Sequence, residues 1–343
     1  MTNPSQAPKP TAKDFASSQE VRWCPGCGDY AIVKAVQRTL ADVEAKTENT
    51  VFVSGIGCAS RLPYYMATYG LHAIHGRAPA IATGIKLANP ELDVWVVSGD
   101  GDALAIGGNH FIHLVRRNVD VQFLLFNNEV YGLTKGQFSP TSRAGTKSPS
   151  SPLGCVENPM SAAQLALGAG AYFVARGVDT AQKQLTKTLT RAYEFTGTAF
   201  VEIFQNCIVF NDGAFAGFTD KDKSAEMQIH VEHGQPLLFG NDNAKGLRIR
   251  PDALELEVVT IGENGISESD VLVHDETNKA LATLLAAMSE PDFPVAMGIL
   301  YCQSGPTFEV ELRKKVKKAT SESTKSLADI LHQGHTWTVT EDT

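Results

Sequence analysis

Short, strongly apolar runs alternate with helical patterns over roughly the first two hundred residues of the chain. The apolar runs are rich in β-branched and aromatic residues, and none shows a clean two-residue alternation of apolar and polar positions. Strands that are buried on both faces have this pattern. The predicted strands are residues 51–54, 94–98, 121–126 and 199–204.

Stretches with helical periodicity lie between these strands, and two more elements are expected near the end of the chain. The predicted helices are residues 30–46, 80–88, 103–117, 162–168, 181–196 and 276–289, and residues 294–301 look like one more strand. A chain that alternates strand and helix forms a parallel sheet with helices on both faces. The predicted fold class is therefore α/β, a three-layer αβα arrangement around a parallel sheet.

The pattern weakens after residue 212, where Gly, Asn and Pro interrupt it at 230–249. We expect residues 20–212 to form the α/β domain and residues 213–343 to form a C-terminal extension that packs on it or on a partner subunit. Residues 1–19 are polar and are expected to form a flexible N-terminal arm. A further segment, 136–159, is a Ser/Pro/Gly/Thr-rich loop long enough to be functional.

The composition of the chain argues against several classes of function. The formal net charge of −8 argues against a nucleic-acid-binding surface, which would be basic. No apolar run approaches the ~20 residues of a membrane-spanning helix. The first residues lack the apolar segment of a secretory signal, so a cytoplasmic location is expected.

A candidate metal and diphosphate site lies at the ends of two predicted strands. Gly99-Asp100-Gly101 follows the strand at 94–98, and Asn127-Asn128 follows the strand at 121–126. Parallel strands joined by one crossover helix end at the same sheet edge, where open α/β sheets bind ligands. Mg²⁺ takes one or two protein oxygen ligands and completes its shell with phosphate and water. Glycine allows close approach of the backbone to a diphosphate, so the two motifs together predict such a site.

The six cysteines are the second candidate for chemistry. Cys24 and Cys27 form a Cys-x-x-Cys turn, which alone is ambiguous between zinc, a redox disulfide and an iron–sulfur cluster. A four-iron cluster needs four thiolates. Cys58, Cys207 and Cys302 each follow a predicted strand, so spacing alone leaves the remaining ligands open. Cys155 lies in a loop and is expected to be a free structural thiol.

At this point the chain resembles a known family, the β subunits of the 2-oxoacid:ferredoxin oxidoreductases. The resemblance covers roughly residues 20–300 and is closest to the 2-oxoglutarate branch. It rests on 99–110 (Gly-Asp-Gly-Asp-Ala-Leu-Ala-Ile-Gly-Gly-Asn-His), on 127–137 (Asn-Asn-Glu-Val-Tyr-Gly-Leu-Thr-Lys-Gly-Gln) and on Ser-Pro-Thr at 139–141. It implies the thiamine diphosphate-binding version of the α/β fold.

The resemblance also implies cofactors and their ligands. It puts Mg²⁺ on Asp100, Asn128 and the backbone carbonyl of Val130, with Glu129 facing solvent. It puts a [4Fe–4S] cluster on Cys24, Cys27, Cys58 and Cys207, and leaves Cys302 as the less favoured fourth ligand. The residues expected to contact thiamine diphosphate are Ile56, Gly57, Cys58, His75, Gly99, Gly101, Asp102, Ala103, Asn128, Val130, Gly132 and Leu133.

The implied reaction is the oxidative decarboxylation of a 2-oxo acid with coenzyme A, with ferredoxin as electron acceptor. Arg61 and Lys135 are candidates to bind the distal carboxylate of a dicarboxylic substrate. The pyruvate-using relatives tend to have Gly-Gly-Gln where this chain has Lys135-Gly136-Gln137, which favours 2-oxoglutarate. Pyruvate or another 2-oxo acid is the alternative.

The site expected from the resemblance is incomplete in this chain. Thiamine diphosphate needs a glutamate against its aminopyrimidine ring, and no second thiamine-type domain is evident in the sequence. A larger α subunit is expected to supply that glutamate and much of the coenzyme A site, in an αβ or (αβ)₂ assembly. Two hypotheses compete with this function: a non-oxidative thiamine-dependent decarboxylase subunit and a non-catalytic iron–sulfur module.

Overall fold

An eight-stranded, mostly parallel sheet organises the protein. The computed structural model describes residues 9–323 and 325–340. The strand order is β2-β1-β3-β4-β8-β7-β13-β9, and every neighbouring pair is parallel except β7 and β13. The strands are β1 (Thr50–Ser54), β2 (Tyr69–His72), β3 (Asp93–Gly99), β4 (Val121–Asn127), β7 (Phe173–Val178), β8 (Thr198–Phe204), β9 (Gln228–Val231) and β13 (Val295–Cys302).

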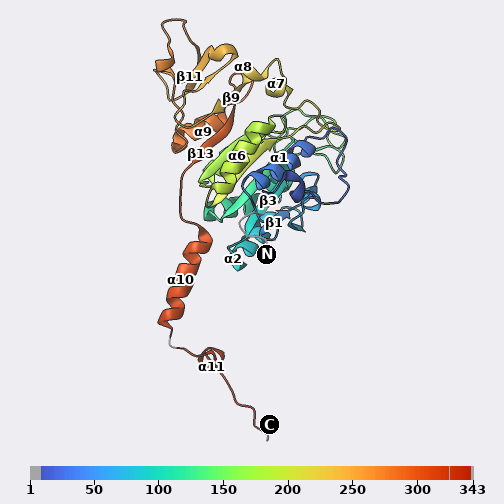
Figure 1. The fold of residues 1–343 in the computed structure, drawn as a ribbon, viewed down its shortest axis with the longest axis vertical. Coiled ribbons are helices and arrows are strands. Elements are labelled where there is room, and N and C mark those ends of the chain that lie inside the picture. The colour runs from blue at the N-terminus through green and yellow to red at the C-terminus, as the bar shows by residue number, and fades with distance from the viewer. Residues whose placement is uncertain (1–8, 324, 341–343) are drawn as a thin grey trace, which may run out of the picture.

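Helices cover both faces of the sheet, as the sequence predicted (Figure 1). One layer consists of α1 (Asp29–Asp42) and α6 (Gln182–Glu194), and the other of α2 (Ala78–Ala88), α4 (Gly108–Arg117), α5 (Ala162–Gly168) and α9 (Lys279–Ala287). Successive strand residues point into different layers: Phe52 packs with α1, whereas Val51 and Val53 pack with α2 and α4. Both faces are therefore apolar, which explains the missing alternation in the sequence.

The long helix expected at 103–117 is two helices. The short α3 (Asp100–Leu104) ends at Ala105, and α4 starts at Gly108. Between them, a Cβ atom on Gly107 would lie 2.4 Å from the carbonyl oxygen of Asp102. The chain passes so close to itself here that it turns instead of continuing one helix.

Several elements were not predicted. They include β2, β7, β9 and a separate antiparallel sheet of β10 (Leu238–Phe239), β11 (Lys245–Ile249) and β12 (Leu256–Thr260). The smaller elements are β5 (Val130–Tyr131), β6 (Gln137–Phe138), α7 (Ala216–Thr219), α8 (Ser224–Met227) and the 3₁₀ turns η2 (Ala12–Phe15), η3 (Ala59–Tyr65), η4 (Asn241–Asn243) and η5 (Glu268–Asp270). Because β9 and β13 extend the main sheet, these two strands are part of the same layered structure as the strands before residue 212.

The two ends of the chain differ from each other. Residues 1–8 of the expected N-terminal arm lie outside the described residues, and residues 9–19 are partly packed on the domain. There η2 packs against α1, and Phe15 is fully buried. At the other end, α10 (Phe308–Glu322) and α11 (Leu327–Leu331) leave the domain as an arm (Figure 1). The lysines at 314–318 are exposed there, as expected.

No helix among the described residues is both long and apolar enough to cross a membrane.

Candidate functional site

The predicted cofactor residues meet in one cleft at the carboxyl ends of β1, β3 and β4. Its lining contains Ile56, Gly57, Cys58, Gly99, Asp100, Gly101, Asp102, Asn128, Val130, Gly132 and Leu133. Two predicted contacts are not in this lining: Ala103 is buried in the hydrophobic core, and His75 lies behind Asp102. The cleft encloses about 50 Å³. Pockets that surround a whole ligand enclose ~300–1,000 Å³, so this cleft is small by comparison.

Asp100 is held firmly from one side. It is the first residue of α3 and is buried, and its Oδ2 atom accepts hydrogen bonds from the hydroxyls of Ser139 and Thr141, both at 2.5 Å. Burial raises the pKa of this carboxyl, and the two hydroxyls lower it. No cationic side chain among the described residues pairs with it. A bound cation would supply the missing positive charge.

The Asn-Asn turn stands opposite Asp100 in the same cleft. The Asn128 side chain accepts a hydrogen bond from the Val130 N–H at 3.2 Å and donates one to Gln205 Oε1 at 2.7 Å. Glu129 lies in the chain between Asn128 and Val130, two of the three proposed magnesium ligands, and has a left-handed φ of 55°. No group of three or more His, Cys, Asp or Glu residues in the described part of the chain converges on one point. A magnesium site of one carboxylate, one amide and one carbonyl needs no such group, so the donor set fits.

Asp102 ties the turn after β3 to two other loops. Its carboxylate accepts hydrogen bonds from the Gly76 N–H at 2.7 Å and the Ser98 hydroxyl at 2.5 Å, and it contacts His75 Nδ1 at 2.7 Å. A Cβ atom on Gly55 would lie 1.8 Å from this carboxylate. Asp102 thus orients His75 and fixes the loops, and its oxygens are already engaged within the protein.

Glu129 does not face solvent, contrary to the prediction. Its side chain is 14% exposed and pairs with Arg143 Nε at 3.3 Å. Burial raises its pKa to about 7, although the Arg143 charge lowers it. Arg143 also reaches Glu290 at 3.3 Å and donates to the Ala214 carbonyl at 2.8 Å. No sequence pattern indicated this pairing, because Arg143 lies in an irregular loop.

Four cysteines gather beside the cleft. A Cβ atom on Gly132 would lie 3.4 Å from Cys207 Sγ and 3.9 Å from Cys58 Sγ. The Cys27 sulfur accepts a hydrogen bond from Gln205 at 3.3 Å. Burial, together with the nearby Asp29, Cys207 and Cys24, raises the pKa of the Cys58 thiol to about 12. Thiols in such surroundings become good ligands only when a positive centre replaces their protons.

The other two cysteines lie elsewhere. Cys302 contacts Arg191 at 4.0 Å, and Glu276 and Arg191 are the charges that act on its pKa. Cys155 is buried in the loop at 143–155. The described structure therefore places Cys24, Cys27, Cys58 and Cys207 in one neighbourhood, although no three of them are arranged to hold a metal ion, and leaves Cys302 and Cys155 apart from them.

Comparison with known proteins shows which family the chain is similar to. Residues 55–203 match the family model described as the thiamine pyrophosphate enzyme, C-terminal TPP binding domain. The 2-oxoglutarate oxidoreductase subunit KorB of Mycobacterium tuberculosis is 46% identical over 95% of this chain and 88% of its own length. The β subunit of 2-oxoacid:ferredoxin oxidoreductase 1 of Aeropyrum pernix is 47% identical over 55% of this chain and 60% of its own length.

The chain belongs to the β-subunit family of the 2-oxoacid oxidoreductases. It is also similar to a solved structure, the 2-oxoglutarate:ferredoxin oxidoreductase from Magnetococcus marinus with 2-oxoglutarate, coenzyme A and succinyl-CoA bound. That similarity has a TM-score of 0.76 at 32% identity and covers 95% of this chain and 96% of the other.

In this β subunit, Arg61 lines a second cavity of about 430 Å³ that adjoins the cofactor cleft. The two spaces share Ile56, Gly57 and Leu133. Lys135 lies in the exposed β5–β6 connection, with a left-handed φ of 77°, and lines neither space. Of the two predicted substrate residues, the structure places only Arg61 in a cavity beside the cleft.

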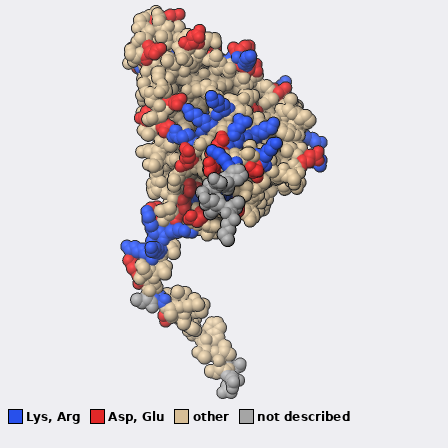
Figure 2. Space-filling model, viewed as in Figure 1, with Lys and Arg blue, Asp and Glu red and all other residues tan. Residues whose placement is uncertain are grey.

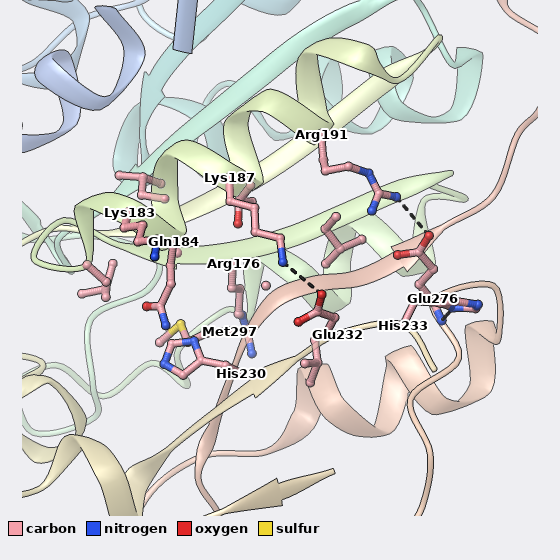
Figure 3. Close-up of a pocket in the computed structure, with 18 residues that line it drawn as sticks. Arg176, Lys183, Gln184, Lys187, Arg191, His230, Glu232, His233, Glu276 and Met297 are labelled. Carbon is pink, nitrogen blue, oxygen red and sulfur yellow. Dashed lines mark hydrogen bonds and ion pairs between the residues drawn. The ribbon is translucent and has the colours of Figure 1, made fainter. Parts of the chain in front are cut away.

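A further cavity among the described residues is separate from this cleft. It encloses about 680 Å³ between α6 and strands β7, β13 and β9, and it shares no lining residue with the cofactor cleft. Two ion pairs, Lys187–Glu232 at 3.1 Å and Arg191–Glu276 at 3.0 Å, reach from α6 across it (Figure 3). Nothing in the predicted chemistry uses this cavity.

Proposed function

We propose that this chain is the β subunit of a 2-oxoglutarate:ferredoxin oxidoreductase. The overall reaction converts 2-oxoglutarate and coenzyme A into succinyl-CoA and CO₂, and passes two electrons, one at a time, to two molecules of oxidised ferredoxin. The observation that supports it most is the meeting of the Asp100 and Asn128 turns with four cysteines at one sheet edge.

Thiamine diphosphate would supply the chemistry that cleaves the bond between the carboxylate and the carbonyl carbon of the substrate. Asp100, Asn128 and the Val130 carbonyl would hold the Mg²⁺ that binds its diphosphate. Ser139 and Thr141 keep one oxygen of Asp100 occupied, so the other is free to face the cleft. Gly99 and Gly101 leave the backbone accessible to the phosphates.

A [4Fe–4S] cluster on Cys24, Cys27, Cys58 and Cys207 would accept the electrons. Such a cluster is held by thiolates and is tuned by hydrogen bonds to its sulfurs. In this chain the Gln205 amide already donates to the Cys27 sulfur. An iron–sulfur centre and unpaired thiols suit a reducing compartment, which supports a cytoplasmic location.

Arg61 is the residue that we assign to substrate selection. A guanidinium binds a carboxylate through two parallel hydrogen bonds, which matches the distal carboxylate of 2-oxoglutarate. Its cavity adjoins the cofactor cleft, so both ends of one substrate could be held at once. Lys135 is a weaker candidate that could reach the substrate only by a movement of the β5–β6 connection.

An α subunit would complete the site. The cleft is too small to enclose the cofactor alone, and the glutamate required against its aminopyrimidine ring would come from that subunit. An αβ heterodimer or an (αβ)₂ assembly would result. The chain purified alone should therefore lack turnover.

The test is co-expression with the α subunit, followed by anaerobic assay of a panel of 2-oxo acids with coenzyme A and a viologen acceptor. We expect the highest kcat/KM for 2-oxoglutarate, and Arg61→Met should raise the KM for 2-oxoglutarate by roughly ten- to a hundredfold with a smaller effect on pyruvate, since a charged hydrogen bond contributes about 1.5–3 kcal/mol. A preference for pyruvate would overturn the substrate assignment.

Metal analysis separates the oxidoreductase from its competitors. Iron and acid-labile sulfide should approach four per chain in anaerobically purified protein, and Cys207→Ala should lower both. Stoichiometric zinc would instead favour a non-oxidative decarboxylase subunit. Full function after Asp100→Ala would favour an electron-transfer module without thiamine chemistry.

A further inference from the structure

Two neighbouring helices carry a concentrated positive charge on a chain that is otherwise acidic. Between their first and last turns, α1 and α6 contain no acidic residue. Their outward side chains include five cations, which we call the α1–α6 basic patch: Lys34, Arg38, Lys183, Lys187 and Arg191. Figure 2 shows blue side chains gathered over these helices. With a net charge of −8, the chain as a whole would repel an acidic protein, so this patch is a local exception.

Three cations of the patch have no ionic partner among the described residues. Lys187 and Arg191 pair with Glu232 and Glu276 (Figure 3). In contrast, Lys34, Arg38 and Lys183 are exposed and make no ion pair with any described residue. Exposed, unpaired cations on two adjacent helices do little for stability. They generate a positive potential that can steer an acidic partner.

The patch begins beside the cysteine cluster. Helix α1 starts two residues after Cys27, and the Gln182 side chain at the start of α6 donates to the Ala31 carbonyl of α1 at 3.0 Å. The loop before α6 also contacts the segment that carries Cys207. In that loop, Asp179 accepts a hydrogen bond at 2.9 Å from the N–H of Asn206, the residue that precedes Cys207. Cys24 itself is exposed. A protein bound to the patch would thus lie close to the thiolate ligands.

We propose that the α1–α6 basic patch, with the exposed edge of the cysteine cluster, is the docking surface for an acidic one-electron carrier protein of the ferredoxin class. This inference rests on the proposed function. Electron transfer weakens steeply with distance, so an acceptor must bind near the exposed cluster ligand. Electron-transfer complexes have small interfaces, and charge complementarity sets their rate of association.

The test uses the complete αβ enzyme with a purified acidic ferredoxin and, separately, a neutral small acceptor such as propyl viologen sulfonate. We expect the double variant Lys34→Glu/Lys183→Glu to raise the KM for ferredoxin by roughly tenfold or more at low ionic strength. Its activity with the neutral viologen and its KM for 2-oxoglutarate should stay unchanged. Added salt should weaken ferredoxin turnover less in the variant than in the parent enzyme, because fewer favourable charge contacts remain to be screened.

A matched control variant makes the same change of charge away from the α1–α6 basic patch. Lys314→Glu/Lys318→Glu alters two exposed lysines on α10, far along the chain from the patch, and should leave the ferredoxin KM unchanged. An unchanged ferredoxin KM in the patch variant, or an equal rise in the control, would overturn the docking surface alone. Loss of the α subunit from the patch variant would show that the patch binds that subunit instead, and would also overturn it. Absence of viologen reduction by the parent enzyme would overturn the proposed function and this inference with it.

Discussion

Close packing at Gly101 determines the shape of the turn that follows β3. Gly101 carries no side chain, and a Cβ atom there would lie 2.4 Å from the ring of Tyr131. The Tyr131 hydroxyl donates to the Gly101 carbonyl at 2.7 Å, which holds the turn after β3 against β5. The glycine is therefore required by packing in this chain, in addition to the space that a diphosphate would need.

Gly101→Ala should displace Tyr131 and break its hydrogen bond to the turn. We expect a destabilisation of about 1–3 kcal/mol, typical of overpacking, together with weaker binding of thiamine diphosphate and Mg²⁺. The checks are chemical denaturation and titration calorimetry. Gly168→Ala in α5 is the matched control, since a Cβ atom there has no neighbour within 4 Å, and it should be neutral or slightly stabilising. Equal effects at both positions would contradict this account.

His274 should make the protein less stable in mild acid. Its ring is buried, its Nε2 atom contacts the Ile299 carbonyl at 2.8 Å, and its Nδ1 atom has no partner. Burial lowers its pKa below the ordinary 6.5, despite the opposing Ile299 carbonyl, Glu276 and Asp275. The unfolded chain then binds more protons than the folded one below about pH 6.5, so the free energy of unfolding falls as the pH drops.

The check for His274 is urea denaturation between pH 7.5 and 5.5. His274→Gln should flatten the decline in the free energy of unfolding, because the amide can donate to Ile299 without titrating. His335→Gln, at an exposed position far along the chain from His274, should keep the parent slope. A variant at 274 with the parent slope would show that other groups cause the acid sensitivity.

At the scale of elements, one short segment fastens both halves of the predicted metal site. Ser139 and Thr141 bind the Asp100 carboxylate, and Ser142 donates to the Glu129 carbonyl at 2.5 Å. The next residue, Arg143, pairs with the Glu129 side chain. The segment 139–143 therefore couples the turn after β3 to the turn after β4, although it belongs to neither strand.

Thr141→Val should weaken Mg²⁺ binding. The change keeps the shape of the side chain but leaves a buried oxygen of Asp100 with one donor fewer, which raises the pKa of that carboxyl further and makes the proton a stronger competitor of the metal. We expect roughly a tenfold higher Mg²⁺ requirement, because a hydrogen bond to a charged group contributes about 1.5–3 kcal/mol. Ser150→Ala, at an exposed position of the same loop, should not change it. Unaltered Mg²⁺ titration of the Val variant would contradict the coupling.

Sequence patterns could predict the elements that are marked by residues close together in the chain. Strands such as β3 and β4 are continuous apolar runs, and Asp100 and Asn128 follow them directly, so their meeting at one edge was predictable from chain order. The break between α3 and α4 was not, because it depends on a close approach of Gly107 to a carbonyl oxygen. The pairing of Arg143 with Glu129 was missed for a similar reason: loop conformation in three dimensions decides it.

At the scale of the whole molecule, the last part of the chain completes the sheet. Strand β13 pairs with β7, and β9 pairs with β13, so these two strands cover the edge that β7 would otherwise expose. The same segment contributes Ile229, Leu281, Leu285, Ala296 and Leu300 to the hydrophobic core, each at most 7% exposed. The hydrophobic pattern after residue 212 is weak, because the strands there are short and separated by irregular loops. The contribution of this segment to the main sheet was therefore not predicted.

Truncation distinguishes a separable extension from a structural part of the sheet. A chain that ends at residue 212 should fail to fold into a soluble monomer. It would lose several core side chains, each contributing about 1.5–3 kcal/mol on burial, against a total stability of about 5–15 kcal/mol, and it would expose the β7 edge. A chain that ends at Glu322, the last residue of α10, should keep the parent free energy of unfolding, because the described residues beyond it are exposed. Cooperative urea unfolding followed by circular dichroism measures both, and a stable, monomeric 1–212 fragment would show that β9 and β13 are dispensable to the sheet.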